Sequence, residues 1–357
     1  MREVKVGVIG CGKNSPNHLR VYSRTPGVRL EAVCDKSEGN ATAMARQFGA
    51  KQIFKEPADM LKLDLDLVDI ITLAESHAPL SIQALESEHN VLVEKPMSLS
   101  SAESVRMISA ARRSGRTLCV NHNKRFYSCV LETKKRVLDA GLKVSRARID
   151  DFFVYSHERP AWTFAKDSGG ILWEAMIHHA YLLEYFLGEI DRVQAVGRAV
   201  NSPVLDSITF LVGSNGNTGV SEFEWSSRYP LFSFQVFTED GTRFDGDFPG
   251  DFVLEWPRKH TRSQPTTVQR LSDDLAMPVE RWRSRIRKST RFPVYGAVSP
   301  YKRTFYSLIG RYLSFIRGEE PSPPVPAEDG LRAVRVLEAA QESIRTGLPQ
   351  DVVRSPV

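Results

Sequence analysis

Short apolar runs alternate with amphipathic stretches over the first 125 residues of the chain. The apolar runs have the length of buried strands, and the stretches between them have the spacing of helices. The predicted strands cover residues 4–9, 29–34, 67–72, 91–93 and 117–121. Strands separated by helices build a parallel sheet with helices on both faces, so this part is predicted to be a doubly wound α/β domain.

The pattern changes at about Gly141, where longer segments of alternating character begin. Alternation with a period of two predicts half-buried strands, and these cover residues 143–155, 193–200, 208–212, 219–225, 232–237 and 252–256. Turn residues at 213–216 and 239–241 join neighbouring strands as hairpins. The sequence therefore predicts an α+β domain with a large, open, mostly antiparallel sheet. One bare face of such a sheet favours a homodimer or homotetramer.

Two long helices are predicted in the second half of the chain. One covers residues 171–187 and ends at Gly188, and the other covers residues 331–344. The expected domains are residues 1–125 with the parallel sheet and residues 126–325 with the open sheet. Residues 326–357 are expected to form a C-terminal helix and tail that pack back on the body.

The first strand ends in a glycine turn, Gly10-Cys11-Gly12-Lys13-Asn14-Ser15. This is the Gly-x-Gly-x-x-Gly pattern of dinucleotide-binding domains, with serine in the third place. Gly10 permits the tight turn, and Gly12 lets the backbone approach a pyrophosphate at the helix N-terminus. The second strand ends at Asp35, where a carboxylate can bind the adenosine ribose and repel a 2′-phosphate. These features predict NAD as the cofactor, while the neighbouring Lys36 leaves NADP open.

The strand at residues 91–93 runs into Glu94-Lys95-Pro96. A surface turn is one interpretation of this tripeptide. In a parallel sheet, however, ligands bind outside the carboxyl ends of the strands, so Lys95 can lie beside a bound cofactor. The residues expected to contact the cofactor are Gly10, Gly12, Lys13, Asn14, Ser15, Asp35, Lys36, Thr72, Leu73, His77, Glu94, Lys95, Asn123, Arg125 and Trp162.

The predicted helix at residues 171–187 carries Glu174, His178 and His179 in a mostly apolar sequence. Residues four apart share a helix face, so Glu174 and His178 are expected to project together. An internally satisfied ion pair is one interpretation of the two residues, and a catalytic pair is the other. A metal site is disfavoured, because Glu-x-x-x-His supplies two ligands and no nearby residue offers a third at ligand spacing.

Composition narrows the class of protein. The 357 residues are 41% hydrophobic and 25% charged, as in ordinary globular proteins, and no apolar run reaches membrane-spanning length. The four cysteines lack metal-type spacing, which predicts reduced, buried thiols in a cytoplasmic protein. Much of the net charge of +5 lies in a basic segment at residues 258–291, which is either a solvated face or a contact for an anionic substrate. Neither nucleic acid nor a membrane is an expected partner.

Taken together, these motifs resemble the Gfo/Idh/MocA family of nicotinamide-dependent sugar and cyclitol oxidoreductases. The resemblance runs over nearly the whole chain. It rests on the glycine turn with the following Pro16-Asn17-His18, on Glu94-Lys95-Pro96 and on Asn123-Lys124-Arg125-Phe126. Trp162 and the segment from Gly169 to His178 are similar to the family pattern too.

Four positions depart from that pattern. Ser15 replaces the third glycine, and Leu73 stands where the family usually has proline after the threonine. Glu174 replaces an aspartate and reaches one methylene further, and Tyr181 stands at a second position that is often aspartate. The last two differences make an unusual substrate the expectation.

The resemblance implies an NAD(P)-dependent dehydrogenase acting on a ring hydroxyl of a sugar, sugar derivative or cyclitol. Oxidation of an alcohol needs a base within hydrogen-bond reach of the hydroxyl. Lys95 is expected to be that acid/base, with His178 as the alternative base or relay and Glu174 fixing the tautomer of His178. The resemblance also implies a cis peptide bond before Pro96.

Three alternatives stay open from the sequence. A non-catalytic, NAD-binding regulator or assembly protein can use the same fold. An NAD-dependent glycosidase can oxidise its substrate transiently and reduce it again. Reduction of an unsaturated or imine substrate is the third alternative.

Overall fold

The computed structural model describes residues 2–153, 170–200, 204–225, 227, 229–256 and 298–354. Trp162 and the basic segment at 258–291 lie outside these residues. Among the helices within them, none is both long and apolar enough to cross a membrane. All four cysteines are buried and free of disulfides, as predicted.

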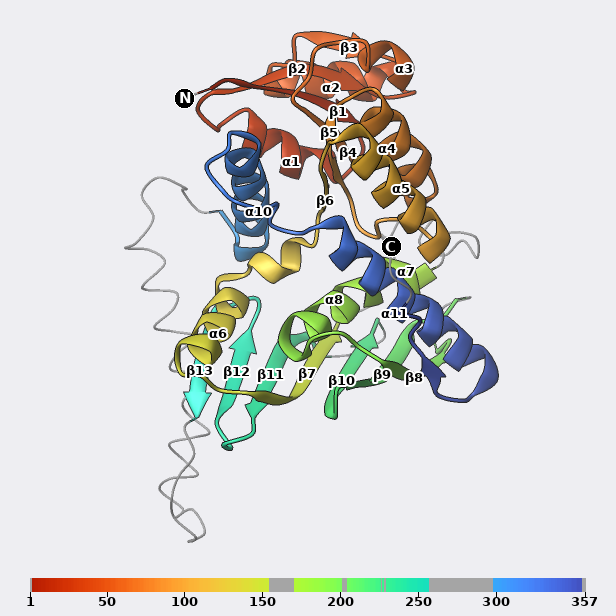
Figure 1. Ribbon diagram of the computed structural model, residues 1–357, viewed down its shortest axis with the longest axis vertical. Coiled ribbons are helices and arrows are strands. Elements are labelled where there is room, and N and C mark those ends of the chain that lie inside the picture. Colours follow the sequence, from red (N-terminus) through yellow and green to blue (C-terminus); the bar gives the residue numbers. More distant parts are fainter. Residues whose placement is uncertain are drawn as a thin grey trace, which may run out of the picture.

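Six parallel strands form the N-terminal sheet, in the order β3-β2-β1-β4-β5-β6 (Figure 1). This order confirms the doubly wound α/β prediction, and it reverses between β1 and β4, where such sheets form their ligand crevice. The short edge strand β3 was not predicted. The strands are β1 Val4–Ile9, β2 Val28–Cys34, β3 Gln52–Phe54, β4 Leu67–Ile70, β5 Asn90–Val93 and β6 Leu118–Val120.

Helices connect these strands and pack in pairs. Helix α1 contacts α2, and α4 contacts α5, with one pair on each side of the sheet (Figure 1). Ser37 and Ser100 cap α2 and α5 by accepting hydrogen bonds from backbone N–H groups in the first turn. The helices are α1 Ser15–Tyr22, α2 Glu38–Phe48, α3 Pro57–Met60, α4 His77–Glu86 and α5 Ser101–Ser114, and the 3-10 turn η1 is Ala74–Ser76.

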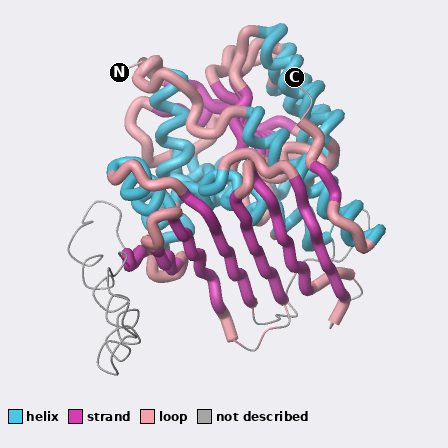
Figure 2. The backbone as a smooth tube through the Cα atoms, turned by 60° about the horizontal axis from the view of Figure 1, so that its bottom comes forward, coloured by secondary structure: helices cyan, strands magenta, loops and turns pink. Residues whose placement is uncertain are grey.

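Eight strands form the second sheet, in the order β13-β12-β11-β7-β10-β9-β8-β14 (Figure 2). Neighbouring strands are antiparallel except for β7 and β10, which confirms the open, mostly antiparallel sheet and both predicted hairpins. Strand β12 was missed, because its Asp-Gly-Asp sequence is typical of turns. The strands are β7 Val144–Phe152, β8 Arg192–Arg198, β9 Ser207–Ser214, β10 Asn217–Glu224, β11 Leu231–Thr238, β12 Arg243–Asp247, β13 Phe252–Trp256 and β14 Gln350–Asp351.

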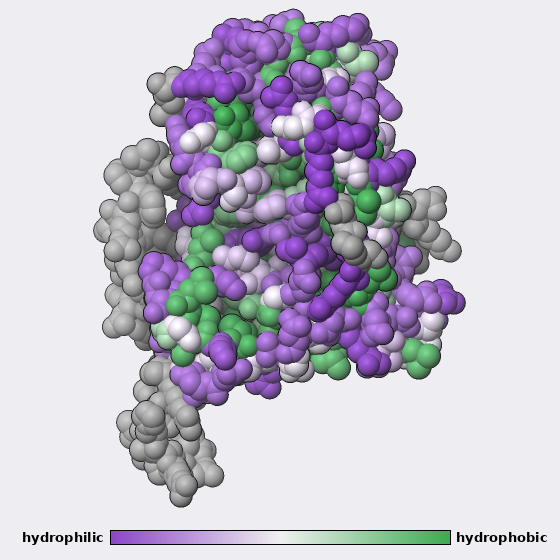
Figure 3. All heavy atoms as spheres, in the orientation of Figure 1, coloured by the Kyte–Doolittle hydropathy of each residue, from purple (hydrophilic) through white to green (hydrophobic). Residues whose placement is uncertain are grey.

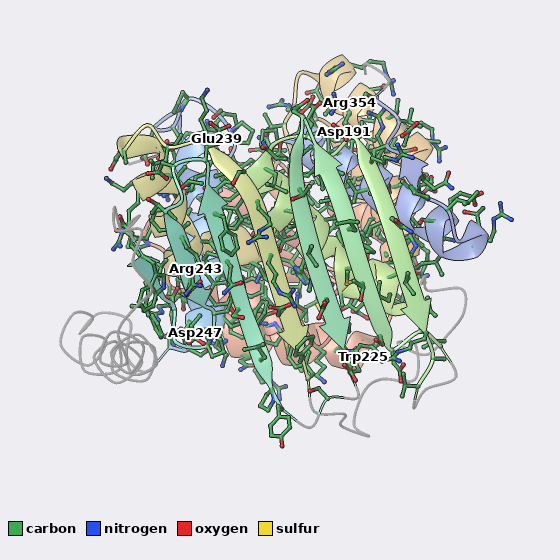
Figure 4. All side chains as sticks on the ribbon, turned by 90° about the horizontal axis from the view of Figure 1, so that it is seen from below. Asp191, Trp225, Glu239, Arg243, Asp247 and Arg354 are labelled. Carbon is green, nitrogen blue, oxygen red and sulfur yellow. The ribbon has the colours of Figure 1, made fainter. Side chains whose placement is uncertain are left out.

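Helices pack on the inner face of this sheet and connect it to the first domain. Helix α8 (Met176–Leu187) packs on β7 and β10, and α6 (Ser128–Asp139) packs on β12 and β13. Helix α11 (Ala327–Thr346) contacts β8, α8 and α5, and so it lies between the two domains (Figure 1). No described helix lies over the outer face, which Figure 4 shows from below.

Helix α10 (Pro300–Ile316) packs on the N-terminal domain. It contacts α1 and the short 3-10 turn η2 (Asn123–Phe126). The buried Tyr312 hydroxyl donates a hydrogen bond to the carbonyl of Val91 at 3.0 Å, which anchors α10 beside strand β5. In the same orientation, Figure 3 shows hydrophobic residues in small groups on a mostly hydrophilic surface.

Candidate active site

The carboxyl ends of the parallel strands bring the predicted residues to one edge of the sheet. Gly10 follows β1, Asp35 follows β2, Thr72 follows β4 and Lys95 follows β5. The peptide bond between Lys95 and Pro96 is cis, as the family resemblance implied. The second domain faces this edge through α7 (Gly170–Glu174), whose last residue contacts Lys95.

Two positions of the glycine turn, Gly10 and Gly12, have different surroundings. Gly10 has a φ of +99°, and a Cβ there would lie 2.4 Å from the carbonyl oxygen of Ile71, so only glycine fits. A Cβ on Gly12 would meet nothing within 4 Å, so open space lies above this residue. The Ser15 hydroxyl turns inward and donates to the Gly12 carbonyl at 2.8 Å, which closes the turn in place of a third glycine.

Asp35 is tied to the glycine turn by its carboxylate. One oxygen accepts the backbone N–H of Cys11 at 2.7 Å, and the other accepts that of Ser37 at 2.8 Å. A carboxylate can accept about four hydrogen bonds, so capacity for ribose hydroxyls remains. Open space over Gly12, an adjacent helix N-terminus and this carboxylate fit a dinucleotide. Lys13 and Lys36 are exposed at the rim of the turn.

A buried ionic network lies directly beneath Lys95. His18 is fully buried between two carboxylates, with Nδ1 at 2.8 Å from Asp69 and Nε2 at 2.8 Å from Glu94. Burial opposes charge on the ring, but the two carboxylates raise the pKa of His18 to about 10. Asn14 and Asn121 donate to the same oxygen of Glu94 at 2.8 and 2.5 Å. The network fixes the side chain of Glu94, the residue directly before Lys95.

The loops after β4 and β5 are joined by His77. Its Nδ1 lies 2.7 Å from the carbonyl oxygen of Pro96, and its Nε2 lies 3.1 Å from that of Thr72. Burial lowers the pKa of His77, while the two carbonyl contacts act in the opposite direction. Thr72 accepts a hydrogen bond from Ser76 at 2.7 Å, whereas Leu73 is 49% exposed and open to a ligand.

Lys95 is held by Glu174 through two hydrogen bonds. Its Nζ donates to the Glu174 carboxylate at 2.8 Å and to the Glu174 carbonyl at 3.0 Å. That carbonyl is the one that His178 N–H would use in a continuous helix. The His178 N–H instead donates to Ala175 at 3.0 Å.

The single helix predicted at residues 171–187 is therefore wrong. The chain forms α7 and α8, separated at Ala175. The expected pairing of Glu174 with His178 is wrong as well, because Glu174 binds Lys95. His178 instead has its Nδ1 at 2.7 Å from the Tyr181 hydroxyl. Burial, helped by the charges of Lys124 and Lys95, lowers the pKa of His178 well below its ordinary value.

Two other predicted residues use their side chains for packing between elements. Asn123 donates to the Thr304 hydroxyl of α10 at 3.0 Å. The Arg125 guanidinium pairs with Asp329 at the start of α11 and lies 4.5 Å from the centre of the Tyr185 ring. Asn123 thus ties η2 to α10, and Arg125 ties η2 to α11 and α8. Trp162 lies outside the described residues.

Two residues of the site, Asp69 and Asn121, were not predicted. Each lies within or directly after an ordinary apolar strand. Asp69 offered one signal, a carboxylate inside a buried strand that requires a partner. In the part of the chain that the structure describes, no group of three or more His, Cys, Asp or Glu side chains is placed to hold a metal ion.

Comparison with known proteins adds an independent line of evidence. Residues 4–122 match the model described as "Oxidoreductase family, NAD-binding Rossmann fold", and residues 142–243 match the GFO/IDH/MocA C-terminal domain. The scyllo-inositol 2-dehydrogenase (NAD(+)) of Bacillus subtilis is 29% identical over 64% of this chain and 69% of its own. The D-apiose dehydrogenase of Paraburkholderia graminis is 25% identical over 97% of this chain and 89% of its own.

Solved structures share the fold. A levoglucosan dehydrogenase in complex with NADH superposes with a TM-score of 0.83 at 19% identity, and the match covers 99% of this chain and 100% of that chain. Both domains, their connection and the glycine turn are thus accounted for by one known architecture. The chain belongs to the Gfo/Idh/MocA family of NAD-binding oxidoreductases.

Proposed function

We propose that this protein transfers a hydride between NAD and a ring hydroxyl or ketone of a sugar, sugar derivative or cyclitol. The observation that carries the proposal is the position of Lys95. Its ammonium group lies at the cofactor edge of the parallel sheet and is aimed by Glu174 from the second domain. The inositol and apiose dehydrogenases among the relatives support the substrate class.

The cofactor would be held by the glycine turn and by Asp35. The turn would receive the pyrophosphate over Gly12, and Asp35 would bind the adenosine ribose hydroxyls. The loop at Thr72 and Leu73 would border the nicotinamide. When bound, the nicotinamide accepts or returns the hydride. The carboxylate of Asp35 favours NAD over NADP, because a 2′-phosphate would meet a negative charge.

Lys95 would carry the proton of the reaction. In oxidation the substrate O–H bond breaks and the proton moves to Nζ of neutral Lys95, while in reduction the ammonium group returns it. The Glu174 contacts restrict the position of Nζ, so that little motion is needed before proton transfer. Buried Glu94 and His18 keep the supporting loop in place.

The test is a titration followed by a substrate panel. Thermal stability is measured with increasing NAD and, in parallel, NADP; sugars, sugar phosphates and cyclitols are then added while reduced nicotinamide is followed by absorbance. We expect stabilisation by NAD at lower concentration than by NADP, and net reduction with at least one panel member. Binding without net reduction would favour a regulator or a transient-redox glycosidase. Absence of binding would refute the proposal.

The outer face of the second sheet would be the contact between two copies of the chain. Val196 on β8 is 65% exposed and Leu211 on β9 is 49% exposed, although both lie within regular strands. Arg148 pairs with Asp150 on its own strand β7 and with Glu222 on the neighbouring β10, so charged and apolar side chains alternate over the sheet face. A mixed surface of this kind suits a self-complementary interface. A cytoplasmic location remains a prediction.

A further inference from the structure

The Tyr181 hydroxyl lies between two groups that determine where its proton points. The backbone N–H of Lys124 donates to it at 3.1 Å, and the Nδ1 atom of His178 lies 2.7 Å away. Tyr181 is 2% exposed, and burial raises the pKa of Tyr181 well above its ordinary value, so the hydroxyl keeps its proton. A backbone amide can only donate, so this contact uses an acceptor site of the hydroxyl.

The hydroxyl proton is therefore available for His178. Among the described residues no other acceptor contacts the Tyr181 hydroxyl. If the imidazole donated from Nδ1, the buried hydroxyl proton would lose its partner, which is unfavourable away from water. The opposite arrangement, in which Tyr181 donates and Nδ1 accepts, satisfies all three groups.

From this geometry we propose that Tyr181 sets the tautomer of His178, so that the neutral imidazole carries its proton on Nε2. The inference rests on the proposed function, and it gives His178 and Lys95 different roles in the reaction. His178 donates a hydrogen bond from Nε2 to the reacting oxygen of the substrate, and Lys95 alone exchanges the proton. Tyr181 is a positioning residue, because it acts through His178.

The surroundings of the ring agree with a neutral imidazole. Lys124 and Lys95 place positive charges near His178, and His179 on the same helix and His122 also lie near it. The Glu174 carboxylate, which was expected to face His178, is bonded to Lys95 instead. Asp151 is occupied by Lys124 at 3.3 Å and lies 3.5 Å from His179. None of these contacts supplies Nδ1 with a carboxylate that would reverse the tautomer.

His122 explains how the Tyr181 ring is kept in this position. The two rings are stacked, with centroids 4.0 Å apart and planes 12° apart. His122 is fully buried, and within the described residues neither ring nitrogen has a hydrogen-bond partner. Burial, with Arg125 nearby, lowers the pKa of His122 to about 3, so the ring is neutral. His122 therefore serves as a flat aromatic support for Tyr181.

The experiment reads the tautomer directly in the full-length protein without cofactor or substrate. Histidine labelled with ¹⁵N is incorporated, the His178 signals are assigned by their loss in His178→Gln, and two-bond ¹H–¹⁵N spectra are recorded between about pH 6 and 8. We expect the neutral Nε2–H form in the wild type. An Nδ1–H form or an imidazolium would overturn the inference.

Variants on the same helix extend the test. Tyr181→Asp supplies an acceptor at this position, and we expect the signals to change to the Nδ1–H form or to the imidazolium. Tyr185→Phe removes a hydroxyl one turn further along α8 and should leave the His178 signals unchanged. An unchanged spectrum in Tyr181→Asp would overturn the inference. Since the spectra need neither NAD nor substrate, the tautomer result stands apart from the outcome of the activity panel.

Discussion

Lys95 and Glu174 are 79 positions apart in the chain, and hydrogen bonds join them across the two domains. The side chain of Glu174 is 37% exposed, so water screens much of the attraction between its charge and Lys95. The hydrogen-bond geometry is unaffected by this screening. Glu174 therefore contributes mainly by aiming Nζ.

Replacing Glu174 by glutamine tests this role at the residue scale. Glu174→Gln keeps the length of the side chain and the main-chain contact but removes the charge, and we expect kcat to fall about 10-fold. The NAD affinity, measured by titration, should not change. Glu174→Asp keeps the charge but is shorter by one methylene. We expect its kcat to lie between those of the wild type and Glu174→Gln. A parallel loss of NAD affinity would instead make Glu174 a cofactor contact.

At the scale of elements, two glycines of the turn between β1 and α1 have different roles. Gly10 is needed for folding, and Gly12 is expected to be needed for NAD binding. Gly10→Ala places a Cβ against Ile71 in a left-handed conformation, and we expect a loss of about 2–4 kcal/mol in the free energy of unfolding. Gly12→Ala meets no atom of the protein. We expect Gly12→Ala to keep wild-type stability but to bind NAD about 10-fold more weakly or worse.

Denaturant unfolding and NAD titration of both variants check this pair. Each variant is the control for the other, because Gly10→Ala is expected to change stability and Gly12→Ala is expected to change NAD affinity. If Gly12→Ala bound NAD as tightly as the wild type, the pyrophosphate would have to lie elsewhere.

The buried His18 links α1 to β4 and β5, and it predicts how stability depends on pH. The pKa of His18 is raised from 6.5 in the unfolded chain to about 10 in the folded protein. A raised pKa stabilises the fold fully below about pH 6.5, and this contribution is lost as the pH rises toward about 10. Compared with His18→Gln, the wild type should be more stable by about 3–5 kcal/mol near pH 6.

Urea unfolding of both proteins at several pH values gives this difference. The stability advantage of the wild type should shrink steadily between about pH 7 and 10. A difference that stays constant over this range would mean that His18 is not charged in the folded protein.

The break between α7 and α8 shows where sequence reasoning reached its limit. The apolar pattern from Ile171 to Leu187 predicted one continuous helix, whereas the chain forms two helices over this stretch. Nothing in that pattern marks Ala175 as a break, and the Glu174 carbonyl beside it accepts a hydrogen bond from Lys95, which is far away in the sequence. The alternation of strands and helices, the glycine turn and the place of Lys95 after a buried strand could be predicted, since local periodicity and motif spacing indicate them.

At the scale of the whole molecule, long-range contacts were the part that the sequence could not supply. Arg125 pairs with Asp329, which lies more than 200 positions later. Lys95 pairs with Glu174 of the second domain, 79 positions later. Such pairs depend on how the two domains pack, which periodicity does not encode.

The exposed sheet face makes a prediction about assembly. We expect the protein to be a dimer, or a tetramer built from dimers, when its mass in solution is measured by light scattering. Leu211→Glu places a charge on the outer face of β9 and should yield monomers with unchanged secondary structure. A matched change at Leu138, which is 65% exposed on α6, should leave the mass unchanged. A monomeric wild type would contradict this role of the outer face.

The most direct test of the account compares Lys95→Met with the wild type on the best substrate of the panel. Methionine has similar length but cannot exchange a proton, so we predict that turnover falls by a factor of at least about 10²–10⁴. NAD should bind to the variant as it binds to the wild type. Turnover near the wild-type rate, with NAD bound, would contradict the assignment of Lys95 as the acid/base of hydride transfer.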